Sequence, residues 1–366
     1  MLTAEELRRY QRHLSLPGFG KAAQERLKAG TVLVIGAGGL GCPALLYLAA
    51  AGVGRIVIID PDTVDTSNLQ RQVLYTEGDV GQPKAEVAAR RLRALNGFID
   101  VAAVTERLRR DNALALIGAC DVVIDGSDNF ATRYLVNDAC VMADRPFVYG
   151  AIQGFEGQLS VFNWQGGPTY RCLFPEPPPA GFAPNCAEAG VLGVLPGIVG
   201  TWQAGEAIKV LTGVGEPLSG KLLLWNALTM NVQTIILAAD PNSRTIRELP
   251  VDTESAACAG DSAGWEIDVP ELRRLLSAGT VQLLDVREDW ERASDAIHPS
   301  VHIPLGMLGH ASGEELLAGL QANQPTVVYC AAGVRSLHAV AILREEFGFR
   351  MAKSLRGGMH AWHAST

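Results

Sequence analysis

The sequence has little positive charge. Its 31 Lys and Arg residues are outnumbered by 39 Asp and Glu residues, which gives a formal net charge of -8 and a pI near 5.4. The basic residues also form no cluster along the chain. Because binding to a phosphate backbone or an anionic lipid surface depends on concentrated positive charge, we expect no nucleic acid partner.

Long apolar runs are absent as well. The stretches over residues 44–52 and 191–199 are too short to cross a bilayer, and Gly or Pro interrupts them. The N-terminus lacks the charged and then apolar pattern of a signal peptide. Instead, Thr3 and Glu6 predict a capping box at the start of a helix. We therefore expect a protein without a membrane span.

The sequence lacks closely spaced, paired cysteines. The seven cysteines are odd in number and widely spaced, which argues against a disulfide framework. We therefore expect a reducing compartment, the cytoplasm, in which free thiols can take part in chemistry.

The length and the periodicity of the sequence favour two α/β domains. A chain of 366 residues exceeds the usual size of one hydrophobic core. Over residues 31–149, short β-branched runs alternate with helical stretches, which is typical of a parallel sheet covered by helices. We predict a doubly wound, mostly parallel sheet over residues 1–250, a linker over residues 251–264, and a second, smaller α/β domain over residues 265–366.

A glycine-rich loop follows the first of these predicted strands and opens a helix. Its glycines are Gly36, Gly38, Gly39 and Gly41. Their backbone amides and the helix N-terminus can hold phosphates, and Asp60, at the end of the next strand, can accept hydrogen bonds from ribose hydroxyls. The same Rossmann-like pattern binds dinucleotides, so an NAD-dependent oxidoreductase is one alternative.

A second set of polar residues distinguishes between nucleotides, namely Asn68, Arg71, Lys84, Asp128 and Asn129. An Arg and a Lys that converge on a triphosphate, with a carboxylate to hold a metal ion, suit attack at the α-phosphorus. Hydride transfer has no use for this set. Each residue alone also has a structural explanation: Lys84 as a surface residue at a helix N-terminus, Arg71 as half of a surface ion pair, and Asp128 as a helix cap.

Together these motifs resemble the ubiquitin-activating enzyme superfamily, in particular the MoeB/ThiF group of adenylyltransferases, over about residues 5–250. The resemblance implies ATP and Mg²⁺ as cofactors. It also implies that the partner is a small ubiquitin-like sulfur-carrier protein, whose C-terminal carboxylate is adenylated. The implied contacts are Gly39 and Asp60 to adenosine and ribose, Asn68, Arg71 and Lys84 to the phosphates, and Asp128 to Mg²⁺.

Arg12 has a separate meaning under the same resemblance. It lies in a Tyr-Gln-Arg-His segment near the N-terminus. By similarity, it matches an arginine that the family inserts into the site of the neighbouring subunit. The resemblance therefore implies a homodimer with two composite sites.

Cys186 lies in a Pro-Asn-Cys-Ala-Glu segment that follows a proline-rich loop. A thiol on a mobile loop beside an activated carbonyl is a useful nucleophile, and in the resembling family this position is the candidate for acyl or persulfide chemistry. The alternative is a buried structural cysteine. Cys42, Cys120 and Cys140 lie on predicted apolar faces, so we expect them in the core.

Many relatives in the resembling group bind a structural zinc through two Cys-x-x-Cys pairs, and such a site needs four thiolates. At the corresponding positions this chain has Thr169 with Cys172 and Ser255 with Cys258. Hydroxyl groups are poor zinc ligands. We therefore expect no zinc.

Cys330 follows a predicted buried strand and leads into a helix. Loop amides, the helix dipole and nearby Arg335 should lower the thiol pKa and stabilise an anionic sulfur. With the segments at residues 284–287 and 297–304, this region resembles the rhodanese sulfurtransferases over about residues 265–364. The resemblance implies a persulfide on Cys330, supplied by a persulfide protein or by thiosulfate.

Two alternatives apply to this second domain. Cysteine phosphatases share the thiolate ringed by amides, but they place five residues between Cys and Arg, whereas four separate Cys330 from Arg335. A rhodanese-like module that serves only for docking usually lacks the cysteine, which this chain retains.

We predict a transferase that adenylates the carrier's C-terminus and then delivers sulfur from Cys330 to it, with Cys186 as a candidate relay. The product would be a C-terminal thiocarboxylate. The alternative from another class is a nucleotide-binding scaffold or sensor without turnover. The sequence leaves open whether the carrier belongs to molybdopterin (molybdenum cofactor), thiamine or cysteine synthesis.

Overall fold

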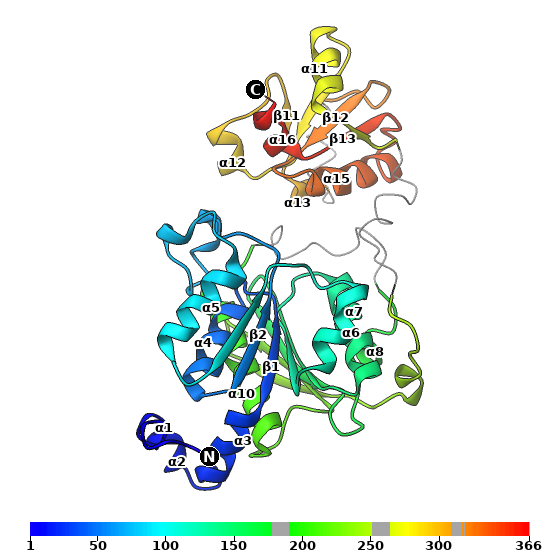
Figure 1. Ribbon diagram of the computed structural model, residues 1–366. Coiled ribbons are helices and arrows are strands. Elements are labelled where there is room, and N and C mark those ends of the chain that lie inside the picture. Colours follow the sequence, from blue (N-terminus) through cyan, green and yellow to red (C-terminus); the bar gives the residue numbers. More distant parts are fainter. Residues whose placement is uncertain (178–189, 251–263, 309–316, 318, 366) are drawn as a thin grey trace. The chain divides into compact units, whose positions relative to one another are not determined.

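The computed structural model describes residues 1–177, 190–250, 264–308, 317 and 319–365. The chain forms two compact units, Met1–Thr253 and Glu254–Thr366 (Figure 1). Each unit contains its own sheet, so each is described by itself.

The first unit is built on an eight-stranded sheet with the order β3-β2-β1-β4-β5-β6-β7-β8. The strands from β3 to β5 in this order run parallel, and β6 to β8 are added antiparallel at one side. The predicted mostly parallel sheet is therefore confirmed. The strands are β1 (Thr31–Ile35), β2 (Arg55–Ile59), β3 (Asp100–Val104), β4 (Val122–Asp125), β5 (Phe147–Gln153), β6 (Glu156–Phe162), β7 (Lys221–Asn226) and β8 (Val232–Ile236).

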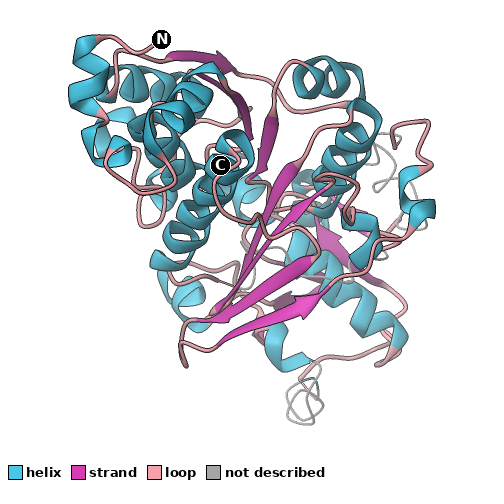
Figure 2. Cartoon of the chain, turned by 90° about the horizontal axis from the view of Figure 1, so that it is seen from below, coloured by secondary structure: helices cyan, strands magenta, loops and turns pink. Residues whose placement is uncertain are grey.

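Helices cover both faces of this sheet, as Figure 2 shows. Alternate residues of β1 explain why: Val32 and Val34 pack into the core under α4, α5 and α10, whereas Leu33 and Ile35 pack into the core under α6 and α7. The helices are α1 (Ala4–Arg9), α2 (Gln11–Leu14), α3 (Gly20–Ala29), α4 (Gly41–Ala51), α5 (Lys84–Leu95), α6 (Arg110–Gly118), α7 (Phe130–Ala143), α8 (Tyr170–Leu173) and α10 (Val194–Thr212), with short 3₁₀ turns η1 (Thr66–Asn68), η2 (Glu77–Asp79) and η3 (Pro241–Arg244).

Several local predictions for the first unit are confirmed. The hydroxyl of Thr3 accepts a hydrogen bond from the Glu6 amide at 3.2 Å, and the Glu6 carboxylate accepts one from the Thr3 amide at 2.7 Å, which makes the capping box of α1. Cys42, Cys120 and Cys140 are buried free thiols in the core.

The second unit has a five-stranded, fully parallel sheet with the order β11-β10-β12-β13-β9. Neighbouring residues of its central strand β12 face opposite sides, with Val328 in one apolar cluster and Val327 in the other. The strands are β9 (Glu266–Ile267), β10 (Gln282–Asp285), β11 (Val301–His302), β12 (Thr326–Tyr329) and β13 (Ala352–Leu355), and the helices are α11 (Val269–Ser277), α12 (Asp289–Ser294), α13 (Leu305–Leu308), α15 (Val334–Glu345) and α16 (Gly358–Ala364).

Over the residues that the structure describes, none of the helices has the length and apolar character that crossing a membrane requires.

Candidate active sites

The glycine-rich loop lies at the carboxyl end of β1, where the chain turns into α4. Gly36 has a φ of +86°, and a Cβ there would lie 2.9 Å from the carbonyl oxygen of Gly126, so a larger residue would be both strained and crowded. The neighbouring strand β4 leads instead to α7, on the opposite face of the sheet. This is the switch point at which open α/β sheets bind ligands.

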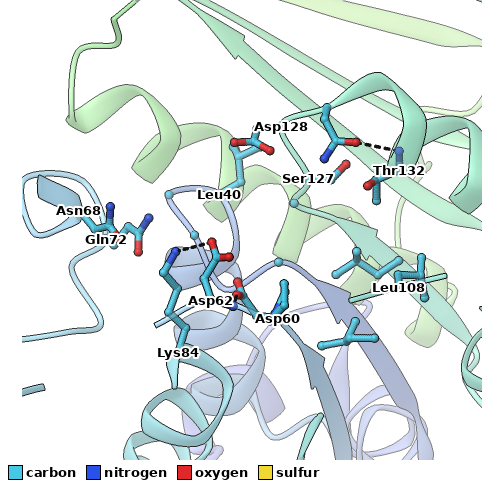
Figure 3. A pocket seen from close by; sticks show the side chains of 18 of the residues that line it. Leu40, Asp60, Asp62, Asn68, Gln72, Lys84, Leu108, Ser127, Asp128 and Thr132 are labelled. Carbon is cyan, nitrogen blue, oxygen red and sulfur yellow. Dashed lines mark hydrogen bonds and ion pairs between the residues drawn. The ribbon is translucent and has the colours of Figure 1, made fainter. Parts of the chain in front are cut away.

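A cavity of about 320 Å³ opens at this switch point (Figure 3). It collects residues from four strand ends and from η1, α5 and α7. The residues predicted from the sequence that line it are Gly36, Gly38, Gly39, Asp60, Asn68, Arg71, Lys84, Asp128 and Asn129.

Asp60 fixes the glycine-rich loop. Its carboxylate accepts hydrogen bonds from the amide of Ala37 at 2.7 Å and from the amide of Asp62 at 2.8 Å. Burial raises the pKa of Asp60, and these two hydrogen bonds partly offset that effect. The side chain therefore holds the loop open at the edge of the cavity.

Lys84 is a buried cation rather than a surface residue. Its side chain is only 7% exposed, and its ammonium group pairs with the Asp62 carboxylate, with Nζ and Oδ2 3.0 Å apart. Figure 3 shows this pair on the cavity wall. Lys84 is also the first residue of α5. A positive charge at a helix N-terminus is unfavourable by itself, so this position suits a site that receives an anion.

Arg71 and Asn68 come from the segment that follows β2. Arg71 donates a hydrogen bond to the carbonyl oxygen of Ser67 at 3.0 Å. Asn68 ends the short turn η1, and its side-chain oxygen lies 3.4 Å from the amide nitrogen of Asp65. The segment therefore carries both side chains to the cavity.

Asp128 presents an exposed carboxylate to the cavity, because the side chains of other residues accept the hydrogen bonds from the neighbouring backbone amides. The buried side chain of Asp125 accepts hydrogen bonds from the amide of Ser127 at 3.0 Å and from its hydroxyl at 2.6 Å. Asn129, not Asp128, caps α7 by accepting a hydrogen bond from the amide of Thr132 at 2.9 Å. Capping therefore does not account for Asp128.

Two of the predicted nucleotide-site residues do not line the cavity. Gly41 begins α4, and a Cβ there would lie 2.0 Å from the carbonyl oxygen of Gly36, so it allows the helix to approach the loop. Arg12 is exposed on α2. Its predicted role concerns the neighbouring subunit.

Sequence reasoning missed several residues that line the cavity. Arg107 follows β3, and its position after a strand was the available signal. Gln72 is 4% exposed, and its Oε1 atom has no hydrogen-bond partner among the residues described. The others are Asp62, Ser127 and Arg133.

Cys172 is one of the four positions that the sequence analysis compared with zinc ligands. Its sulfur is 3.1 Å from the hydroxyl of Ser243 and accepts hydrogen bonds from the amides of Asp240 and Thr169, each at 3.3 Å. Burial favours a higher thiol pKa, but these donors outweigh it and the pKa of Cys172 is lowered. Ser255 and Cys258 lie outside the described residues.

Because a Cys₄ zinc site needs all four thiolates and two of the four positions lie outside the described residues, the expected absence of zinc stays a prediction. Within the described ranges, no group of three or more His, Cys, Asp or Glu side chains is placed to hold a metal ion. Ser243, which the sequence did not single out, is the residue that meets Cys172.

In the second unit, Cys330 directly follows β12 and is 1% exposed. Its sulfur accepts a hydrogen bond from the amide of Gly333 at 3.1 Å and lies 3.4 Å from the hydroxyl of Ser336. Gly333 has a φ of +95° and directly precedes α15. A Cβ at Gly358 would lie 2.2 Å from the carbonyl oxygen of Cys330, so glycine is required for α16 to pack against this loop.

Arg335, the other predicted residue of this loop, is held by Glu291 of α12. The two guanidinium Nη atoms donate to the two carboxylate oxygens, both at 2.7 Å. A bidentate pair of this kind fixes orientation as well as distance. The predicted relay Cys186 lies outside the described residues.

The buried motif at residues 284–287 supports the loop from behind. Arg287 donates to Asp285 at 3.0 and 2.8 Å and to the side chain of Asp295 at 3.1 Å, and its guanidinium lies over the ring of Tyr329. These contacts tie the ends of β10 and β12 together. Arg287 therefore stabilises the strand ends beside the loop that begins at Cys330.

Family models match a large part of each unit. The ThiF family model matches residues 10–245, and the rhodanese-like domain model matches residues 268–365. The protein named probable adenylyltransferase/sulfurtransferase MoeZ from Mycobacterium tuberculosis is 47% identical over 99% of this chain and 94% of its own length. Adenylyltransferase and sulfurtransferase MOCS3 from Mus musculus is 41% identical over 99% of this chain and 86% of its own length.

Two further similarities concern the first unit. A sulfur carrier protein adenylyltransferase from Thermus thermophilus is 52% identical over 69% of this chain and 95% of its own length. Among solved structures, E. coli MccB with AMPCPP and MccA is similar with a TM-score of 0.56 and 25% identity, over 64% of this chain and 72% of that one.

Proposed function

Because the chain belongs to the ThiF family and carries a C-terminal rhodanese-like domain, we propose that its two sites act in sequence on the C-terminus of one small carrier protein. The chain is an adenylyltransferase and sulfurtransferase of sulfur-carrier proteins, and it uses ATP. The resemblances stated from the sequence are confirmed. Neither an NAD-dependent oxidoreductase nor a scaffold without turnover is favoured.

The first step takes place in the glycine-loop cavity. Gly39 and Asp60 would contact adenosine and ribose, and Asn68, Arg71 and Lys84 would contact the phosphates. The observation that carries this assignment is the buried ammonium group of Lys84 at the start of α5, in the same cavity as the glycine-rich loop. An oxygen of the carrier's C-terminal carboxylate attacks the α-phosphorus, pyrophosphate leaves, and fixed cations stabilise the charge that develops on the phosphates.

Asp128 is the candidate ligand for Mg²⁺. Its carboxylate faces the cavity, and Mg²⁺ prefers oxygen ligands from one or two carboxylates together with substrate phosphates. The ion would neutralise phosphate charge when bound. Asp125 and Ser127 hold the loop that presents Asp128 to it.

The second step uses the mixed anhydride that adenylation creates. A free carboxylate is a poor electrophile, whereas the acyl-adenylate has a reactive carbonyl and a stable leaving anion. The outer sulfur of a persulfide on Cys330 attacks that carbonyl directly, or Cys186 first accepts the sulfur. AMP leaves, and the carrier ends in a thiocarboxylate after the remaining sulfur–sulfur bond is reduced by a thiol.

An exposed sheet edge is available for the protein substrate. All five residues of the edge strand β8 are exposed, including Ile236 at 73%, and Leu228 and Met230 in the adjoining turn are exposed as well. An edge strand with exposed apolar side chains suits addition of a strand from a partner. We place the carrier at this edge.

Three further properties belong to the same proposal. The chain forms a homodimer in which Arg12 enters the neighbouring subunit's nucleotide site. The sulfur donor is a persulfide or thiosulfate. The protein works in the cytoplasm, where the free thiols of the described cysteines stay reduced.

One experiment tests the whole scheme. Each candidate carrier, from molybdopterin, thiamine or cysteine synthesis, is incubated with the enzyme, Mg·ATP, thiosulfate and a thiol reductant, and its intact mass is measured. Replacement of one oxygen by sulfur in one carrier would identify both substrate and reaction. If every carrier keeps its mass although ATP is consumed, the transfer step is wrongly assigned.

A further inference from the structure

The loop over residues 330–335, here called the sulfur loop, contains the cation Arg335. The carboxylate of Glu291 binds the guanidinium of Arg335. Both Nη atoms of Arg335 donate to Glu291 at 2.7 Å, and the two side chains are only 15% and 11% exposed. An anionic substrate that needs this guanidinium must therefore displace a bidentate, largely buried partner.

The charges around Arg335 favour this pair. The pKa of Arg335 is raised, chiefly by its hydrogen bonds to Glu291 and to a smaller extent by nearby Cys330 and Glu288. Burial works toward a higher pKa for Glu291, but the hydrogen bonds from Arg335 and from the Glu288 amide outweigh it, so the pKa is lowered. The pair is thus ionised at neutral pH, and its net charge is zero.

The buried Arg287 of the second unit is engaged too. Arg287 donates to Asp285 and Asp295, and it is 3% exposed. The exposed Arg356 lies 3.4 Å from Glu266. The sulfur site consequently offers a dianion less positive charge than its sequence suggests.

We propose that Glu291 determines which sulfur donor the enzyme accepts: by neutralising Arg335, it makes the site favour a low-charge thiol persulfide over dianionic thiosulfate. This inference rests on the proposed role of Cys330 and narrows the donor that role left open. Glu291 is a positioning residue in this scheme, since it acts through Arg335.

Both donors deliver the same atom by the same displacement. With thiosulfate, the Cys330 thiolate attacks the outer sulfur, a new sulfur–sulfur bond forms, and sulfite leaves with the electron pair of the broken bond. With a persulfide R–S–SH, the thiolate again attacks the outer sulfur, and R–S⁻ leaves and takes up the proton. Only the reaction with thiosulfate brings a dianion to the loop and releases a second dianion, sulfite. Only this reaction therefore needs a free guanidinium.

The test variant is Glu291→Gln in the full chain. Glutamine keeps the shape, can still accept from Arg335 and can still bond the Glu288 amide that begins α12 at 3.0 Å, but it carries no charge. Transfer to cyanide is measured with thiosulfate and with the persulfide of N-acetylcysteine methyl ester, a donor without other charges. We expect the KM for thiosulfate to fall about tenfold, with little change for the persulfide.

Matched variants separate this role from a structural one. Glu271→Gln removes one carboxylate from an exposed pair with Arg274 on α11 and should leave the donor ratio unchanged. Glu291→Asp keeps the charge and should keep the preference for the persulfide. The double variant Glu291→Gln with Arg335→Gln should lose the gain for thiosulfate, because that gain depends on the freed guanidinium.

An unchanged ratio of kcat/KM for the two donors in Glu291→Gln would overturn the proposal, as would an equal change for both. If this variant does not fold, the wild-type enzyme still decides, since a higher kcat/KM for thiosulfate than for the persulfide contradicts the proposal. Transfer that persists with both donors in Cys330→Ala would instead mean that the sulfur site itself is misassigned.

Discussion

Asp62 holds the ammonium group of Lys84 on the wall of the nucleotide cavity, with Nζ and Oδ2 3.0 Å apart. The carboxylate is 61% exposed, whereas the lysine is 7% exposed. Incoming phosphates therefore compete with a solvated carboxylate for a cation that is already in position. This arrangement preorganises Lys84 before the substrate binds.

Replacing Lys84 should stop adenylation. We expect Lys84→Ala to lower carrier-dependent exchange of pyrophosphate into ATP by about 100-fold or more, because no fixed cation would remain at this point of the cavity. Lys21→Ala, on the exposed side of α3, is the matched control and should behave like the wild type. Exchange near the wild-type rate in Lys84→Ala would show that the phosphate site lies elsewhere.

The proposed role of Arg12 in the partner's site can be tested by complementation. Arg12→Ala and Lys84→Ala homodimers should each be inactive in exchange, since every site lacks one group. A mixed dimer would have one doubly defective site and one intact site, so mixing and reassembling the two variants should restore activity. A mixture that exchanges subunits but stays inactive would contradict the composite site.

The two catalytic sites should be separable by mutation. Cys330→Ala should keep pyrophosphate exchange but lose both sulfur transfer to cyanide and thiocarboxylate formation on the carrier, because only the second unit stores sulfur. The readouts are radiolabel exchange, thiocyanate formation and the intact mass of the carrier. Wild-type thiocarboxylate output from Cys330→Ala, with thiosulfate as the sole source, would defeat the two-site scheme.

Cys186→Ala reports on the relay. If Cys186 carries the sulfur between the sites, exchange and transfer to cyanide should both persist while thiocarboxylate output falls sharply. Normal output would mean that the persulfide attacks the acyl-adenylate directly, and Cys186 would then have a structural role.

Cys172 should behave as a reactive thiol without zinc. Its pKa is lowered by hydrogen bonds, whereas burial raises the pKa of Cys42 and of Cys120 to about 12. Iodoacetamide at mildly alkaline pH should therefore modify Cys172 well before these two, as peptide mass mapping would reveal. Elemental analysis should find no zinc in the purified protein, and one tightly held zinc per chain would refute that expectation.

Acid should weaken the second unit through Glu291. The pKa of this group is lower in the folded chain than its ordinary value of 4.5, so its ion pair stabilises the fold above that value and loses its effect as the pH falls through the folded pKa. Glu291→Gln should cost roughly 1–3 kcal/mol at pH 7 and less in acid. Urea unfolding from pH 7 to pH 3 would check this, and a constant difference between the two proteins would contradict it.

The residues of the nucleotide site that directly follow a strand in the sequence could be predicted. Gly36 and Asp60 each follow a recognisable strand, and parallel neighbours bring such ends together. The ion pair of Lys84 with Asp62 spans 22 positions and has no periodic signature, so the sequence predicted Lys84 in the site but not its partner.

The same limit applies more strongly to the surroundings of Cys330 and of Cys172. Cys330 and Arg335 could be identified because one short loop contains both, but Glu291 lies 44 positions before Arg335. Ser243 meets Cys172 across 71 positions. Such contacts depend on how separate loops pack, and a propensity or motif contains no information about that.

The pairing of β9 with β13 has a consequence for biosynthesis. Among the described strands of the second unit, β9 is the first to be translated, yet at the edge of the sheet it pairs with β13, the last one. The ribosome must therefore expose nearly the whole unit before that edge can close, whereas the strands of the first unit are complete much earlier. A nascent chain would carry a finished adenylation fold while its sulfur-carrying fold is still open, and chaperones would meet mainly the latter.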